Sequence, residues 1–474
     1  MKNILNKLKS TAVLNVFKYS MVKYIALAFV FFREIVNAKI LGPEMVGILG
    51  NLILIISYCG YANLGVVYAM NREWIVYKDN EGESDKAREV INTSFSALSI
   101  VSLIFLIASI SSIFVFEGIS KWYMSLLFII AITEQYKNFF INYFRLLNNL
   151  NMINLIELLN GIGTLILILL LGGSFKILGV LFAMTIIGIV IFLVSIIKVP
   201  KINIKINKEI LKTLISIGIP LLIYNLGFYI LTTIDRFVII KFLGNEALGY
   251  YTFANQMATA TLVFISSILF LFYPKMISKY NSGDNSEIIK SIYSYTGLIE
   301  LFNIVFIFIG VIVIKPFIDI ILPNFKGSIS TYNILLMAII MSNFSYFSNV
   351  FIIAKKKQNV LVVVQILSII INLLLNILGV KLNLDIIGVA IATLITNTIY
   401  SFIQHYIVNY KIRKSNFIKD LVKMYSGMII ISTYLVTVVI IDLNYMKIVL
   451  GLFIIMLLMI PKFFNIKKLI DDIK

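Results

Sequence analysis

The side chains most able to do chemistry in this sequence are charged residues that interrupt long apolar stretches. Placing such a charge in hydrocarbon costs from about 3 to more than 10 kcal/mol, so each should face a cavity, an ion or a charged partner. The basic residues could bind an anionic substrate, and the acidic residues could bind H⁺ or Na⁺ or act in gating. The candidates for substrate binding are Lys23, Arg33, Lys137 and Arg236, and those for ion coupling or gating are Glu34, Glu134, Glu157, Asp235 and Glu300.

Several of these charges also have a purely structural interpretation. Glu134 and Lys137 are three residues apart, so they share one face of a helix and can satisfy each other. Lys23 lies near the end of its apolar stretch, from which its ammonium group can reach the lipid interface. Glu157, Asp235 and Glu300 can equally be satisfied polar contacts. The sequence leaves these alternatives open.

Membrane-spanning helices must position these charges. The 474 residues are 60% hydrophobic and 14% charged, with a mean hydropathy of +0.97, which excludes an ordinary soluble globule. A helix needs about 20 apolar residues to cross a bilayer. The sequence therefore predicts an all-α, polytopic membrane protein of about fourteen spans. We expect the spans at about 14–40, 46–69, 91–116, 122–144, 152–171, 177–197, 214–240, 247–272, 291–314, 332–354, 360–379, 386–407, 424–441 and 447–464.

Lysine and arginine alternate in density from loop to loop. Most of the 41 basic residues fall in every second loop, for example in 198–212 and 355–357, whereas the intervening loops hold one or two each. Basic loops remain on the cytoplasmic side, so both termini are predicted to be cytoplasmic. The bias toward Ile, Asn and Lys is that of an AT-rich bacterium, so we expect the chain to lie in a bacterial cytoplasmic (inner) membrane. Loops facing an anionic leaflet also account for the net charge of +18, and no nucleic-acid partner is expected.

One nine-residue phrase occurs twice. KILGPEMVG at 39–47 returns as KFLGNEALG at 241–249, with the same Lys, Leu, Gly, Glu and Gly at equivalent positions. Gly42 and Gly244 suit a backbone that turns between two helices. Gly47 and Gly249 would allow neighbouring helices to approach closely. Both phrases follow a span of the same orientation, which is the pattern of a duplicated transporter.

The repeat predicts two lobes of six helices each. We expect an N-terminal lobe at 1–205, a C-terminal lobe at 206–410, and two further helices with a cytoplasmic tail at 411–474. The repeat also places Arg33 opposite Asp235 in the alignment, and Glu34 opposite Arg236. Equivalent positions thus carry opposite charges, and a hypothesis is that these residues pair across the lobe interface in one state.

Four stretches of the sequence resemble a known transporter family. They are REIVNAKILGPEMVG at 33–47, NLGVVYAMNRE at 63–73, DRFVIIKFLGNEALGYY at 235–251 and FYPKMISKY at 272–280. These stretches are similar to those of the polysaccharide flippases of the MOP superfamily, the Wzx-type exporters of O-antigen and capsule repeat units. The resemblance implies a transporter that moves undecaprenyl-diphosphate-linked oligosaccharide from the inner to the outer leaflet by alternating access. It also implies contact with membrane lipids and with other polysaccharide assembly proteins.

Two relatives of the same fold remain as alternatives: a flippase for lipid-linked peptidoglycan precursors and a multidrug exporter coupled to H⁺ or Na⁺. An enzyme is not expected, because the outward loops are too short for a catalytic site. The sequence has no GxxxxGK(S/T) phosphate-binding loop, which argues against a P-loop ATPase within this chain. The single cysteine, Cys59, excludes a disulfide framework and a thiolate metal site. We expect no cofactor and a monomeric protein. For His405, anchoring at the membrane interface is favoured over a role as a proton relay.

Overall fold

The computed structural model describes residues 2–79, 84–199, 202–263, 276, 285–355, 357–413, 417–441 and 445–463. Every regular element in these ranges is helical, as the sequence predicts. The end of the eighth predicted span, the segment FYPKMISKY apart from Met276, and the tail from 464 onward lie outside the described residues.

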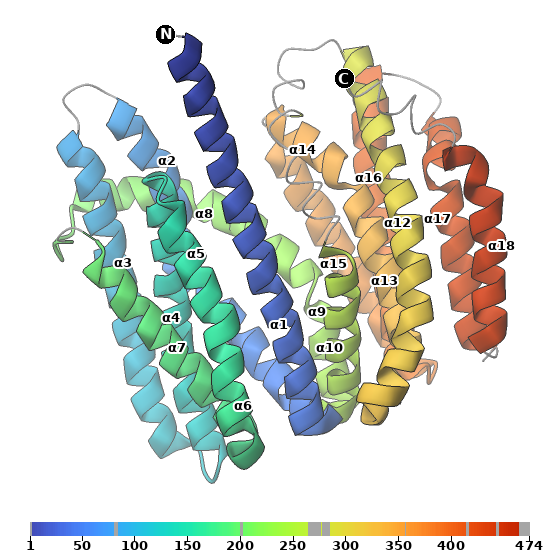
Figure 1. Cartoon of the computed structure of the whole chain (residues 1–474), viewed down its shortest axis with the longest axis horizontal. Helices are drawn as coiled ribbons and strands as arrows, with labels where there is room; N and C mark the ends of the chain where they lie inside the picture. Colours follow the sequence, from blue (N-terminus) through green and yellow to red (C-terminus); the bar gives the residue numbers. More distant parts are fainter. Residues whose placement is uncertain are drawn as a thin grey trace. The chain divides into compact units, whose positions relative to one another are not determined.

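The described residues form two compact units. Unit 1 comprises Met1–Leu41 and Ile48–Leu226, and unit 2 comprises Gly42–Gly47 and Gly227–Lys474. The predicted lobes at 1–205 and 206–410 stay a prediction. Each unit is described separately below (Figure 1).

Unit 1 is built mainly from α1 to α8. Their bounds are α1 (Lys2–Cys59), α2 (Val66–Asp79), α3 (Ser84–Val115), α4 (Ser120–Leu146), α5 (Leu150–Leu158), α6 (Thr164–Phe175), α7 (Ile177–Ile197) and α8 (Lys208–Leu231), with two short turns, η1 (Gly60–Asn63) and η2 (Leu159–Gly163). Helix α4 packs against both α3 and α7. Aromatic side chains of α3 and α4, including Phe95, Phe139 and Phe140, fill the core beside it. This core fixes the face that α4 turns toward α1 and η2.

Unit 2 continues with the remaining helices. Their bounds are α9 (Ile234–Phe242), α10 (Gly244–Thr261), α12 (Asn285–Ile321), α13 (Ile329–Phe344), α14 (Tyr346–Ala354), α15 (Gln358–Lys381), α16 (Asp385–Arg413), α17 (Phe417–Ile440) and α18 (Tyr445–Phe463), with a short turn η3 (Pro323–Ser328). Helix α16 packs against α13 and α15, and α10 packs against α13. The last two helices, α17 and α18, contact each other and α12.

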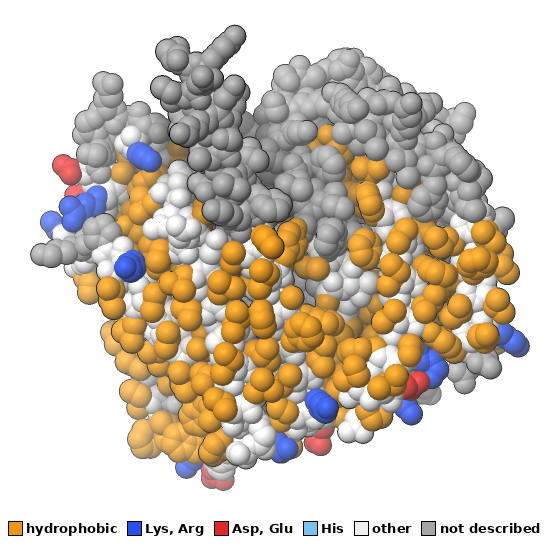
Figure 2. All heavy atoms as spheres, viewed as in Figure 1, with side chains coloured by type: hydrophobic (Ala, Val, Ile, Leu, Met, Phe, Trp, Pro, Cys, Tyr) orange, Lys and Arg blue, Asp and Glu red, His pale blue; other side chains and the backbone are white. Residues whose placement is uncertain are grey.

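The helices are suited to a bilayer by length and composition. Within the described ranges, nine helical segments are long and apolar enough to cross a membrane, and α17 and α18 supply shorter apolar helices. One of the nine, Met21–Asn63, contains most of the first predicted span and much of the second, and the chain turns between them at Gly42. Hydrophobic side chains make up much of the described surface in this view, and the visible charges lie near its margins (Figure 2). The chain is therefore a multi-pass membrane protein.

Several predicted spans are interrupted helices. The fifth predicted span is formed by α5, η2 and α6, the seventh by α8 and α9, and the tenth by α13 and α14. Interruptions free backbone groups that need hydrogen-bond partners, and in a membrane such groups are tolerated only inside protein or beside a cavity. We therefore expect polar side chains to gather at these breaks in each unit.

The two copies of the repeated phrase contact each other within unit 2. Gly42 and Gly244 adopt the positive φ expected of a turn between helices, 74° and 87°. A Cβ atom added to Gly47 would overlap the carbonyl oxygen of Asn245. One added to Gly249 would likewise overlap the Pro43 carbonyl oxygen. The prediction of a close helix approach is confirmed, and the approaching segments are the two copies themselves.

Adding one methyl group at this crossing should destabilise the protein. Gly249→Ala is expected to lower the free energy of unfolding by about 1–3 kcal/mol, because backbone atoms cannot move aside as a flexible side chain does. Thermal unfolding in detergent measures the effect. The control is Gly173→Ala in α6, where an added Cβ has no neighbour within 4 Å. Equal unfolding temperatures for the two variants would contradict the crossing.

Candidate functional site

A polar pocket lies among the helices of unit 1. Its volume is about 470 Å³, and it is lined by residues of α1, η1, α4, η2, α6 and α7. Its polar lining includes Arg33, Ser57, Glu134, Gln135, Lys137, Asn138 and Asn160. This volume is within the range of about 300–1,000 Å³ that is usual for small-ligand sites. We refer to it as the polar pocket.

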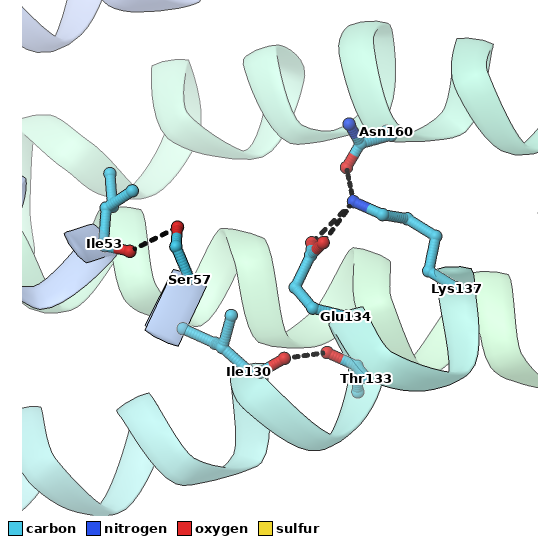
Figure 3. A network of polar contacts seen from close by, with 7 residues as sticks. All are labelled: Ile53, Ser57, Ile130, Thr133, Glu134, Lys137 and Asn160. Carbon is cyan, nitrogen blue, oxygen red and sulfur yellow. Dashed lines mark hydrogen bonds and ion pairs between the residues drawn. The ribbon is translucent and has the colours of Figure 1, made fainter. Parts of the chain in front are cut away.

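An ion pair with a third partner forms one wall of the polar pocket. The Lys137 ammonium lies 2.6 Å from both carboxylate oxygens of Glu134, one turn away on α4. It also donates a hydrogen bond to Asn160 Oδ1 at 3.3 Å (Figure 3). The expectation that Glu134 and Lys137 satisfy each other is therefore confirmed. Because Lys137 is only 17% exposed, the pair holds its ammonium at the pocket wall.

Arg33 is paired with its own sequence neighbour. Its Nη2 and Nε atoms lie 2.8 and 3.1 Å from Glu34 Oε1, and both side chains are largely buried. Adjacent residues point about 100° apart on a helix, but these long side chains bend to meet. The predicted pairing of Arg33 with Asp235 across the lobes stays a hypothesis.

The turn that carries Asn160 is a local departure from the α-helix. Residues Leu159–Gly163, with sequence LNGIG, form one π-helical turn between α5 and α6. A π turn inserts an extra residue and often marks a functional site. Close packing accompanies it, because a Cβ on Gly161 would lie 2.9 Å from the Ala26 carbonyl oxygen of α1. The turn positions the Asn160 amide against Lys137 (Figure 3).

Gln135 connects α4 to the end of α1. Its Nε2 donates to the carbonyl oxygen of Cys59 at 3.2 Å, which is one of the carbonyls left without an α-helical partner where the helix ends. The carbonyl acceptor fixes which end of the amide is nitrogen. The other atom, Oε1, is buried and has no hydrogen-bond partner among the described residues. Gln135 is only 2% exposed.

A second polar centre lies within unit 2, around Asp235. The residue is buried in the first turn of α9, where its carboxylate accepts the Arg236 backbone N–H at 2.8 Å. It also accepts a hydrogen bond from the Tyr251 hydroxyl of α10. That hydroxyl lies 3.4 Å from Thr393 Oγ1 of α16. One carboxylate thus links three helices.

The other predicted site residues lie outside the lining of the polar pocket as described. Lys23 is exposed on α1, and Glu157 is half-buried on α5 shortly before the π turn. Glu300 is buried on α12 and Arg236 is half-buried on α9, both in unit 2. Arg33, Glu134 and Lys137 are therefore the predicted residues that the pocket brings together.

The expectation for His405 is wrong. The side chain is 2% exposed, and it does not anchor at the membrane interface. Its Nε2 lies 3.1 Å from the carbonyl oxygen of Phe344 and its Nδ1 lies 2.9 Å from Ser348 Oγ. Phe344 ends α13, so its carbonyl needs a donor, which fixes Nε2 as the protonated nitrogen and leaves Nδ1 to accept from Ser348. The residue ties α16 to the break between α13 and α14.

Sequence reasoning missed the amides of the polar pocket. Gln135, Asn138 and Asn160 line the pocket, whereas the candidates predicted from the sequence were all charged residues. A signal was present in TEQYKN at 133–138, a polar run in the middle of a predicted span. Asn160 had a weaker signal, because NGIG within an apolar span indicates an irregular turn.

Comparison with known proteins identifies the family. The family model of the polysaccharide biosynthesis proteins matches residues 12–280, which is more than half of the chain and includes the polar pocket. No curated protein matches the chain significantly.

Solved structures show the same fold. An inward-facing multidrug resistance MATE transporter of the MOP superfamily is similar with a TM-score of 0.65 and 17% identity, covering 84% of this chain and 94% of that one. The lipid II flippase MurJ in an inward closed conformation gives 0.64 and 18%, covering 95% and 99%. A MOP superfamily transporter from Pyrococcus furiosus, whose description notes a binding pocket of reversed polarity, gives 0.51 and 15%, covering 88% and 96%. The chain belongs to the family of polysaccharide biosynthesis proteins and has the fold of the MOP superfamily transporters.

Proposed function

We propose that this protein is a flippase that moves polyprenyl-diphosphate-linked saccharides from the inner to the outer leaflet of the bacterial cytoplasmic membrane. The observation that carries the proposal is the polar pocket inside the membrane-spanning helices of unit 1, in a region matched by the polysaccharide family. Burying ionised side chains at membrane depth is costly, and a polar transported group accounts for retaining them. A sugar-bearing head group is such a solute.

The substrate-binding role falls on the basic residues. Arg33 and Lys137 line the polar pocket and are the proposed basic contacts for a head group there. Lys23, exposed on α1, and Arg236 in unit 2 lie elsewhere and remain proposed contacts for the diphosphate. Alternating access would carry the head group past these sites while the polyprenyl chain stays in the bilayer.

We propose Asp235 as the residue that couples transport to an ion gradient. Its carboxylate is buried, yet its hydrogen bond from Tyr251 can be exchanged for a bound H⁺ or Na⁺. Such an exchange would loosen the link among α9, α10 and α16. Glu34, Glu134, Glu157 and Glu300 are the other acidic candidates for coupling or gating.

Deletion of the gene tests the proposed function. Lipid-linked saccharide should accumulate in the inner leaflet and a surface polysaccharide should be lost, as measured by fractionating lipid-linked sugars and by surface labelling. A plasmid copy of the gene should restore both.

The same strain separates the alternative functions. Accumulation of peptidoglycan precursor with cell lysis would favour a precursor flippase, to which the fold likeness over 95% of the chain points. Unchanged glycans with altered drug susceptibility would favour a cation exporter. Either result would overturn the proposal.

A further inference from the structure

The charges of the polar pocket compensate each other. Arg33 is neutralised by Glu34 at 2.8 Å, and Lys137 by Glu134 at 2.6 Å. A diphosphate carries several negative charges, so its binding here would require breaking an ion pair and leaving a carboxylate beside it. Separating one partner from a buried ion pair is strongly unfavourable, and solvent at Glu134, which is 38% exposed, reduces that cost without removing it. The pocket is therefore poorly matched to the anionic part of the proposed substrate.

The uncompensated groups of the polar pocket are neutral amides. Gln135 Oε1 is a buried acceptor without a partner among the described residues. Asn160 and Asn138 use their Oδ1 atoms as acceptors, from Lys137 at 3.3 Å and from Asn142 at 3.0 Å, so their amide N–H groups remain as donors toward other groups. A mixture of neutral donors and acceptors matches hydroxyl and acetamido groups.

We propose that the polar pocket of unit 1 binds an uncharged sugar residue of the substrate, with Gln135 Oε1 accepting a hydrogen bond from a sugar hydroxyl. The inference rests on the proposed function and names which part of the substrate occupies this pocket. A site built to hydrogen-bond a hydroxyl rejects ligands without one, because its own buried polar groups are then left unpaired. The diphosphate is bound outside this pocket.

Binding of two lipids to the purified full-length protein tests the assignment. One is undecaprenyl diphosphate, and the other is the same lipid carrying a single N-acetylglucosamine or galactose. The glycosylated lipid is expected to bind about tenfold more tightly, because the hydrogen bonds between the sugar and the pocket should contribute about that factor to the affinity. Gln135→Leu should remove this gain and leave the affinity for undecaprenyl diphosphate unchanged.

A second variant distinguishes a loss of sugar binding from a loss of folding. Gln135→Leu also removes the donor to the Cys59 carbonyl, whereas Asn160→Leu does not touch that bond and should reduce the same gain. Gln404→Leu is the matched control, since Gln404 is a fully buried glutamine of α16 in unit 2, and it should leave both affinities unchanged.

Different results would contradict the sugar assignment and the proposed flippase function. Equal affinities for the two lipids in the unaltered protein would overturn the sugar assignment, as would a Gln135→Leu effect on undecaprenyl diphosphate itself. Failure of the protein to bind any of these lipids would instead overturn the proposed flippase function.

Discussion

Lys137→Met is expected to abolish most transport and to lower the stability of the protein. The substitution removes the ammonium group that lies 2.6 Å from Glu134 and 3.3 Å from Asn160, and it leaves the Glu134 carboxylate unpaired at the pocket wall. Removing one partner of a fully buried pair costs about 3–5 kcal/mol. Glu134 is 38% exposed, so solvent reduces that cost, and we expect about 1–3 kcal/mol in thermal unfolding.

A double variant separates a ligand role from a structural role of this pair. In Glu134→Gln/Lys137→Met no unpaired charge remains, so stability should return to within about 1 kcal/mol of the unaltered protein. Transport of lipid-linked saccharide into proteoliposomes should nevertheless stay reduced by about tenfold, because the N–H donors of Lys137 are still missing. Full recovery of transport in the double variant would show that the pair only holds helices together.

A second ion pair supplies the control. Lys315 and Asp319 are four residues apart near the end of α12, with 2.6 Å between their charged atoms and side chains 40% and 32% exposed. Lys315→Met/Asp319→Asn should change the stability by less than about 1 kcal/mol and leave transport unaltered. A comparable loss of transport there would mean that removing any ion pair impairs the protein.

Asp235→Asn is expected to uncouple transport from the ion gradient. Asparagine keeps the shape of the side chain, but it cannot exchange a proton or hold a cation by charge. Transport driven by an imposed pH or Na⁺ gradient should fall to the level without a gradient, about tenfold or more, as measured in proteoliposomes. Exchange of substrate across the membrane without a gradient should remain.

The geometry around Asp235 makes this effect specific. The carboxylate accepts from the Tyr251 hydroxyl and from the Arg236 backbone N–H, so its protonation changes bonds to α10 and to α9 at once. Asp319→Asn is the control carboxylate in the same unit, since Asp319 is half-exposed and paired with Lys315. An Asp235→Asn protein that still responds to the gradient would shift the coupling role to another acid, such as Glu300.

Regular features of the fold were predictable because they depend on local rules. Hydrophobic length predicted the spans, and glycine at 42 and 244 predicted turns with positive φ, which the structure has. The i to i+3 spacing of Glu134 and Lys137 predicted their pairing in the same way, since helix geometry alone places the two side chains together.

The features that were missed depend on where helices break. The π turn at LNGIG, the Gln135 bond to the Cys59 carbonyl and the burial of His405 against the Phe344 carbonyl all satisfy groups freed by an interruption. An apolar run of sequence gives no direct indication of such a break. The carbonyl group that loses its helical partner is hydrogen-bonded by a side chain from a distant segment, and the local sequence does not show that partner.

The sequence by itself determined a multi-pass helical protein, its repeated phrase and its list of charges in the membrane, since hydrophobic length and residue type suffice for these. The tertiary structure alone decided which polar groups of separate helices meet and which polar atoms are left without a partner among the described residues. Lys137 of α4 meets Asn160 of the π turn, Gln135 Nε2 of α4 meets the Cys59 carbonyl at the end of α1, and Gln135 Oε1 has no partner among the described residues. Those outcomes depend on side-chain distances between separate helices, and the pattern of residue types along the chain carries no such distances.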